Sequence, residues 1–142
     1  MTDSDKWITP PDLLAQLDKE FHFTRVGGAM FDPCPITWKV GDPDGLIVDW
    51  APRTFVNPPF SNVALWIKKA SEEYKNGKLV VMLINAVTGT NAFHEYIYPE
   101  FKKPDGKIEL RFFKGRLRLI NPAKPDERKA SPHDSMLVIF KP

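Results

Sequence analysis

The chain has 142 residues, of which 42% are hydrophobic and 27% charged, so its composition is that of a globular domain large enough to build a core. No stretch approaches the roughly 18 apolar residues of a membrane-spanning helix, and the acidic, polar residues 1–12 do not have the pattern of a signal peptide. The net charge is only +2. The length predicts a single domain that spans residues 1–142. A single cysteine, Cys34, excludes an internal disulfide, which favours a reducing, cytoplasmic setting.

The first part of the chain predicts one helix and three short strands. PPDLLAQLDKEF indicates a helix over residues 10–21, because proline suits the first helical turn and the leucines recur on one face. Short apolar runs then indicate strands at residues 25–35, 46–50 and 53–59. The last of these strands stops at two adjacent prolines, which donate no backbone N–H to a sheet.

The middle of the chain predicts a helix followed by a buried strand. NVALWIKKASEEYKNG indicates a helix over residues 62–77, with Ser61 or Asn62 as its N-cap and Gly77 just after its last turn. The next segment, KLVVMLINA at residues 78–86, is a continuous apolar run. Such a run is typical of a strand that is covered on both faces of its sheet.

The rest of the chain predicts a short helix or turn, two strands and a long loop. Residues 91–101 are expected to be helix or turn, and residues 106–115 and 135–141 to be strands. Residues 121–134, NPAKPDERKASPHD, are rich in proline and charge and predict a loop. Helices that alternate with strands favour the α/β class, here as a compact Rossmann-like fold with a mostly parallel sheet flanked by helices.

Three polar residues come directly after predicted strands. They are Asp32, Asn57 and Asn85. Open α/β sheets bind ligands at the carboxyl ends of their strands, so we expect these three side chains to share one rim of the sheet.

Charge is unevenly distributed along the chain. Residues 1–60 hold 5 Lys or Arg and 9 Asp or Glu, whereas residues 102–129 hold 10 and 4. A basic segment on a nearly neutral protein predicts contact with a polyanion. The alternative is a loop whose lysines are merely solvated.

The segment Asn57-Pro58-Pro59-Phe60 combines an amide, two rigid prolines and an aromatic ring. The lone pair of an exocyclic amine on a base is delocalised into the ring, so hydrogen-bond acceptors for the amine would make it more nucleophilic. The Asn57 side-chain oxygen and the Pro58 carbonyl are two such acceptors, and Phe60 offers a face for stacking. The prolines fix these groups in place, and a base in a duplex must leave the stack to reach them.

This segment resembles the N-P-P-Y/F motif of S-adenosyl-L-methionine-dependent N6-adenine methyltransferases. Most of the chain resembles the small phage-type (Dam-like) DNA N6-adenine methyltransferases. The shared segments, in chain order, are WITPPDLLAQLDKEFHFT, FDPCP, DGLIVDW, FVNPPFSNVALWIKKA, VVMLINAVTGTNAFH, FFKGRLRL and MLVIF. Glutamine methyltransferases that act on translation factors share the N-P-P motif, so a protein amide is an alternative substrate.

The resemblance implies roles for individual residues. It implies a catalytic motif formed by Asn57, Pro58, Pro59 and Phe60. It also implies S-adenosyl-L-methionine as the cofactor, bound by Trp7, Thr9, Pro10, Asp32, Pro33, Cys34 and Asn57.

Some of these residues also have plainer interpretations. Thr9 fits a helix N-cap, Asp32 a turn residue and Cys34 a packing residue. The chain also departs from the usual methyltransferase pattern. Asp32 is followed by PCPITW in place of a glycine-rich loop, and Gly27 and Gly28 precede it.

The basic segment is the expected DNA contact, because 142 residues leave little room for a separate target-recognition domain. The residues expected to contact phosphate are Lys114, Arg116, Arg118, Lys124, Arg128 and Lys129. An internal ion pair is the alternative for Arg116. A DNA-binding relative of the fold without catalytic activity is the alternative for the whole protein. No metal site is expected, the oligomeric state is left open, and the resemblance implies a phage or prophage origin.

Overall fold

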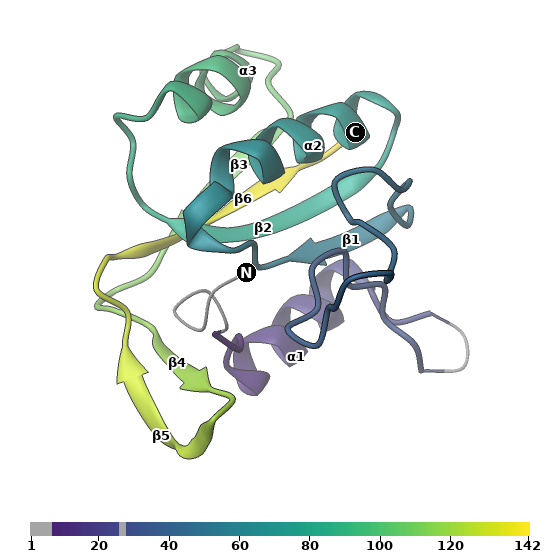
Figure 1. Ribbon diagram of the computed structural model, residues 1–142. Helices are drawn as coiled ribbons and strands as arrows, with labels where there is room; N and C mark the ends of the chain where they lie inside the picture. The colour runs from purple at the N-terminus through teal and green to yellow at the C-terminus, as the bar shows by residue number, and fades with distance from the viewer. Residues whose placement is uncertain (1–6, 26–27) are drawn as a thin grey trace.

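The computed structural model describes residues 7–25 and 28–142, apart from the side chains of residues 125 and 127–129. A four-stranded sheet has the order β1-β2-β6-β3. Its strands are β1 (Arg53–Val56), β2 (Leu79–Asn85), β6 (Ser135–Phe140) and β3 (Ile108–Phe112). The predicted α/β class is confirmed (Figure 1).

The sheet is mixed, so the prediction of a mostly parallel sheet is wrong. Strands β1 and β2 pair in parallel, whereas β6 pairs antiparallel with both β2 and β3. All six residues of β6 are buried, and β2 is buried except at its two ends. A continuous apolar run shows that a strand is covered on both faces, but it carries no information on strand direction.

Helices cover both faces of the sheet (Figure 1). Helix α2 (Val63–Lys75) packs on one face together with the π-helical turn η3 (Phe93–Ile97), which continues into α3 (Tyr98–Phe101). Helix α1 (Pro11–Phe21) packs on the other face. The helices expected at residues 10–21, 62–77 and 91–101 are therefore present.

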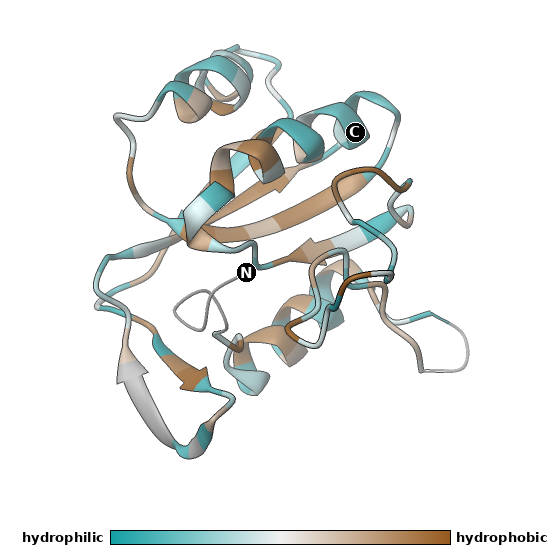
Figure 2. Ribbon diagram, in the orientation of Figure 1, coloured by the Kyte–Doolittle hydropathy of each residue, from teal (hydrophilic) through white to brown (hydrophobic). Residues whose placement is uncertain are grey.

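Alternate residues of β2 enter two separate hydrophobic clusters, one under each layer of helices. Val80, Met82 and Ile84 pack on the side of α2. Val81 and Leu83 pack on the side of α1, with Phe55 and Phe21. Figure 2 shows the apolar character of β2 and β6 at the centre of the fold. This alternation is the reason that the sequence of β2 reads as continuously apolar.

The ends of the two long helices follow the sequence signals in part. Helix α1 begins with Pro11, and Pro10 occupies the N-cap position without a side-chain hydrogen bond. Asn62 is the N-cap of α2, also without a side-chain cap. Gly77 follows that helix with φ +90°, a conformation that favours glycine.

Three expected elements are wrong. Residues 25–35 and 46–50 form no strand among the described residues; Met30 of the first makes one isolated bridge, to Thr24, and the second begins as a turn and then has no regular structure. Gly28 has φ +86°, whereas Gly27 lies outside the described residues. The predicted loop at residues 121–134 mostly forms a strand.

That strand belongs to a hairpin of β4 (Arg118–Asn121) and β5 (Lys124–Ala130), a separate two-stranded sheet. The composition of β5, KPDERKA, is poor in the residues that favour strands, so nothing local predicts it. The Asn121 side chain accepts a hydrogen bond from the Ala123 N–H at 3.0 Å and closes the turn. Pairing with β4 therefore outweighs the weak propensity of β5.

The hairpin extends away from the four-stranded sheet and lies beside the N-terminal segment (Figure 1). Ile8 and Ile120 form an antiparallel bridge, with N···O distances of 2.9 and 3.2 Å. The Ser131 N–H donates to the Leu117 carbonyl at 2.9 Å. The bridge to Ile8 joins β4 directly to the segment that precedes α1.

Candidate active site

A rigid corner follows the end of β1. The strand stops at Val56, Asn57 comes next, and Pro58 and Pro59 are both buried. The chain then turns into the short 3-10 helix η2 (Phe60–Asn62), which leads into α2. Because the prolines cannot continue a ladder of hydrogen bonds, the corner holds Asn57 at the carboxyl end of β1.

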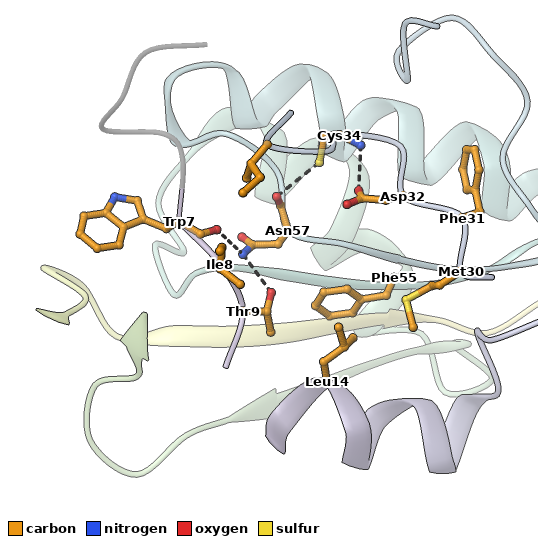
Figure 3. A pocket seen from close by; sticks show the side chains of 11 residues that line it. Trp7, Ile8, Thr9, Leu14, Met30, Phe31, Asp32, Cys34, Phe55 and Asn57 are labelled. Carbon is orange, nitrogen blue, oxygen red and sulfur yellow. Dashed lines mark hydrogen bonds between the residues drawn. The ribbon is translucent and has the colours of Figure 1, made fainter. Parts of the chain in front are cut away.

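The side-chain amide of Asn57 is held by the N-terminal segment. Its Nδ2 donates to the Thr9 hydroxyl at 3.0 Å and to the Trp7 carbonyl at 3.3 Å (Figure 3). Within the described part of the chain, no group donates a hydrogen bond to Asn57 Oδ1. The acceptor end of this amide is therefore available to a ligand.

Cys34 holds the backbone of the same residue. Its thiol donates to the Asn57 carbonyl oxygen at 3.3 Å. Burial raises the pKa of the Cys34 thiol far above its usual range, and the neighbouring Asp32 carboxylate raises it further. The thiol therefore stays protonated and serves as a donor, which agrees with the packing role considered from the sequence.

A cavity of about 340 Å³ lies against this corner. Five of the residues expected at the cofactor line it: Trp7, Thr9, Asp32, Cys34 and Asn57. They come from three separate parts of the chain, and Figure 3 shows them around one space. Apolar side chains supply most of the remaining wall, namely Ile8, Leu14, Met30, Phe31, Ile36 and Phe55.

Asp32 gives the cavity one carboxylate. It is exposed at the surface of the cavity, and its Oδ1 accepts a hydrogen bond from the Cys34 N–H at 3.0 Å. Desolvation by the surrounding wall raises the pKa of Asp32, and the bond from Cys34 acts in the opposite direction. A cationic group in the cavity would favour the ionised carboxylate. This short turn fits the plainer interpretation of Asp32 as a turn residue.

Phe60 faces a second, smaller cavity of about 140 Å³. Asn85 and Thr90 line it, together with Phe93 and apolar residues of α2 and β2. The expected rim is thus divided: Asp32 and Asn57 share the first cavity, and Asn85 belongs to the second. The four-residue motif spans the distance between the two cavities.

Three prolines of the expected site, Pro10, Pro33 and Pro59, line cavities other than the first. Pro33 and Pro59 border a cavity of about 200 Å³, which also contacts Trp38 and Trp66, and Cys34 lies between it and the first cavity. Pro10 lines a groove between the start of α1 and the chain that leads into β4. The structure therefore does not place Pro10 and Pro33 in the wall of the first cavity.

Four of the basic residues expected at DNA have described side chains, and all four are exposed: Lys114, Arg116, Arg118 and Lys124. Arg128 and Lys129 lie in β5, but their side chains are outside what the structure describes. Arg116 lies 4.0 Å from Asp134, and both side chains are largely exposed. Such a long, solvated pair holds Arg116 only weakly.

Part of the basic excess in residues 102–129 is paired with carboxylates at the surface of the fold. Arg111 forms two hydrogen bonds with the Glu20 carboxylate, at 2.7 and 2.6 Å, and also pairs with Glu109. Lys103 pairs with Glu100 at 2.6 Å. Lys114 and Arg116, on the chain that leads into β4, are exposed basic residues of this segment outside those pairs.

The described residues contain no group of three His, Cys, Asp or Glu side chains suited to a metal ion. Among them there is also no helix long and apolar enough to cross a membrane.

The sequence model of the DNA N-6-adenine-methyltransferase (Dam) family matches residues 1–142, the whole chain. The chain belongs to this family. The resemblance noted in the sequence is therefore confirmed at the level of the family. No curated protein and no solved structure is significantly similar to the chain.

For several residues that line the first cavity, no pattern in the sequence predicts a place in the site. Ile36, Phe55 and Met30 line the cavity as ordinary apolar side chains. The bonds from Asn57 to Trp7 and Thr9 cross about 50 residues of chain, which no local pattern predicts. For Thr9, the N-cap interpretation is wrong, because α1 has no side-chain cap and the hydroxyl accepts from Asn57.

Proposed function

We propose that this Dam-family protein transfers a methyl group from S-adenosyl-L-methionine to the N6 amine of an adenine that has left the DNA stack. The observation that carries the proposal is the orientation of Asn57. Its Nδ2 is taken up by Thr9 and Trp7, and its Oδ1 stays available at the edge of a cavity. A fixed acceptor is what an amine nucleophile requires.

In this proposal the corner prepares the amine for attack. Asn57 Oδ1 and the Pro58 carbonyl accept the two hydrogens of N6, which moves the nitrogen lone pair out of conjugation with the ring. Phe60 stacks on the base. With the cofactor bound, the nitrogen would form a bond to the methyl carbon as the carbon–sulfur bond breaks, the sulfur would leave as a neutral thioether, and the nitrogen would lose one proton to solvent. No covalent bond to the protein is needed. Pro59 keeps the acceptor and the ring in a fixed relation.

The first cavity fits S-adenosyl-L-methionine by size and by chemistry. Its volume of about 340 Å³ is within the usual range for small-molecule sites, and most of its wall is apolar. The Asp32 carboxylate suits a cationic group, and Trp7 and Thr9 line the same cavity while their acceptors hold Asn57. When bound, the cofactor supplies an electrophilic methyl group on a sulfonium. Pro33 and Pro10 would act only indirectly, through the turns that carry Cys34 and Thr9.

We assign the hairpin and the chain that leads to it to DNA contact. Lys114, Arg116, Arg118 and Lys124 are exposed there, and Arg128 and Lys129 belong to the same proposal. Lysine and arginine bind phosphates without reading sequence. In this view residues 1–142 form a single methyltransferase domain, and the hairpin provides its contact with DNA. The proposal includes a phage or prophage origin for the protein and its activity in the bacterial cytoplasm.

The proposal is tested by two measurements on the intact chain. Calorimetry measures the binding of S-adenosyl-L-methionine, and mass spectrometry of nucleosides measures N6-methyladenine in DNA after incubation with cofactor. We expect both binding and N6-methyladenine. Assays on single-stranded and duplex DNA then show which form is the substrate.

Three results would contradict the proposal in different ways. DNA binding without cofactor binding would identify a non-catalytic relative of the fold. Methylation of a protein glutamine amide, with unmodified DNA, would move the activity to another substrate class. Cofactor binding with methylation at another position of the base would contradict the assigned role of Asn57.

A further inference from the structure

The segment at residues 7–9 makes two contacts that belong to different parts of the fold. The Trp7 carbonyl and the Thr9 hydroxyl both accept from Asn57 Nδ2. Ile8, between them, pairs through its backbone with Ile120 in β4. Neighbouring residues therefore hold the amide of the catalytic motif (Figure 3) and, through the Ile8–Ile120 bridge, the hairpin.

The Trp7 carbonyl decides which end of the Asn57 amide faces the segment. A backbone carbonyl can only accept a hydrogen bond, so it selects the NH₂ end. With the amide rotated by half a turn, Oδ1 would face this carbonyl oxygen without a proton between them. The Thr9 hydroxyl accepts from the same nitrogen at 3.0 Å, which is the shorter of the two bonds.

Thr9 is placed to act as a fixed partner. It is 7% exposed, and its hydroxyl is not used to cap α1. Pro10 follows it, with φ near −53°, and restricts its backbone to an extended conformation. A buried acceptor on a restricted backbone holds the amide more tightly than a mobile surface side chain would.

We infer that Thr9 is a positioning residue: its hydroxyl holds the Asn57 amide in the orientation that the Trp7 carbonyl selects, so that Oδ1 faces the adenine amine. This inference rests on the proposed function and deepens it. Thr9 acts through Asn57 in this role, whereas the family resemblance assigns Thr9 to the cofactor. The two roles predict different kinetic effects, because orientation of the acceptor affects the chemical step and a cofactor contact affects binding.

The test compares Thr9→Val with Thr9→Ser. Valine keeps the shape and β-branching of threonine but removes the acceptor, whereas serine keeps the hydroxyl and removes the methyl group. We expect Thr9→Val to lower kcat about 10-fold, the upper range for loss of one hydrogen bond, with the KM for cofactor within about twofold of wild type. Thr9→Ser should keep kcat within about threefold.

A second measurement does not depend on activity. The side-chain NH₂ signals of Asn57 in an NMR spectrum are identified by their loss in Asn57→Ala. We expect these signals to shift and to exchange faster with water in Thr9→Val, and to stay near their wild-type positions in Thr9→Ser. If the wild type does not methylate DNA, the proposed function fails, and the NMR comparison still decides whether Thr9 orients the amide.

Each other result would overturn the inference. Wild-type kcat in Thr9→Val would show that the hydroxyl is not needed for orientation. A raised KM for cofactor with unchanged kcat would make Thr9 a cofactor contact only. Equal losses in the valine and serine variants would assign the effect to packing of the methyl group. If Thr9→Val does not fold, Thr9→Ala against Thr9→Ser provides the same comparison.

Discussion

The corner after β1 and the β4–β5 hairpin differ in how they are held. Asn57 is fixed by contacts from Trp7, Thr9 and Cys34, and the two prolines beside it are buried. Among the described side chains of residues 118–130, Leu119 alone is buried. The backbone bridge between Ile8 and Ile120 joins the hairpin to the segment before α1.

This difference matches what each region is proposed to do. Transfer of a methyl group requires an acceptor placed to within a fraction of an ångström, so the corner must be fixed. Attraction between lysines and phosphates acts over several ångströms, so the hairpin needs charge more than exact placement. Mutations in the corner should therefore affect rate, and mutations in the hairpin should affect the salt dependence of binding.

The largest effect is expected from Asn57→Ala. Loss of the oriented acceptor should lower kcat by about 100-fold or more, the scale seen when a single preorganised polar group is removed from an active site. Cofactor affinity should weaken only modestly, and thermal unfolding should confirm that the fold is intact. The measurement is the rate of N6-methyladenine formation. A rate within about threefold of wild type would refute the mechanism.

The next effect concerns Phe60. Phe60→Ala should cost about 1–3 kcal/mol of base stacking, or roughly 5- to 150-fold in kcat/KM for DNA. Phe60→Tyr keeps the ring face and is the matched control, with near wild-type activity. Steady-state kinetics on one DNA substrate compare the two. Equal activities for the alanine and tyrosine variants would rule out a stacking role.

A smaller effect, in a different quantity, is expected at the hairpin. Replacing Lys124, Arg128 and Lys129 together with Gln should reduce the slope of log K against log salt by up to about three units, because each neutralised phosphate contributes about 0.9. Cofactor affinity should not change. DNA affinity measured at several salt concentrations gives the slope.

The matched control removes the same charge from α2 and from the residue before β3, outside the hairpin. Lys68, Lys75 and Lys107 are exposed on α2 and before β3. Their triple Gln variant should bind DNA with a nearly unchanged salt slope. Equal slopes of log K against log salt for the hairpin variant and the wild type would show that DNA contacts another face.

The smallest effect is expected from Asp32→Asn. The pKa of Asp32 is raised in the fold, so its ionisation opposes folding, and this cost appears as pH rises above about 4. Asparagine removes that cost and keeps an acceptor for the Cys34 N–H. At pH 7 the variant should therefore be more stable, by at most about 0.5 kcal/mol because the site is exposed.

Cofactor binding should change in the opposite direction. We expect Asp32→Asn to weaken cofactor affinity several-fold, on the scale of one exposed charge pair. Wild-type affinity should fall as pH drops toward the pKa of Asp32, and the affinity of the variant should not follow that fall. Unfolding curves and calorimetry at pH 4, 5.5 and 7 measure both effects. A less stable variant at pH 7 would contradict this account.

The sequence allowed more of the corner than of the hairpin to be predicted. Asn57, the two prolines and Phe60 are adjacent in the chain, and the chemistry of their groups follows from residue type alone. Strands such as β2 are apolar along their whole length, which identified them. By contrast, β5 is held by pairing with β4, and a sequence of KPDERKA contains no local signal for that pairing.

Strand direction and distant contacts could not be predicted for a related reason. The apolar pattern of β6 is the same whether it runs parallel or antiparallel to β2. The partners of Asn57 lie about 50 residues away, and their hydrogen bonds depend on how the whole chain folds back. Local sequence patterns predict which residues are buried and whether a segment is helix or strand, whereas these contacts depend on the tertiary structure.

The position of β6 has a consequence for how the protein folds. This strand follows every other element in the chain, yet it lies between β2 and β3, which do not pair with each other. Until residues 135–140 have left the ribosome, β2 and β3 each have an open edge and an apolar surface without cover. The sheet can be completed only after synthesis has passed this point, and its long-range pairings favour slow folding. Newly made chains therefore expose these edges until β6 joins the sheet, and slower synthesis of residues 135–140 should prolong that exposure.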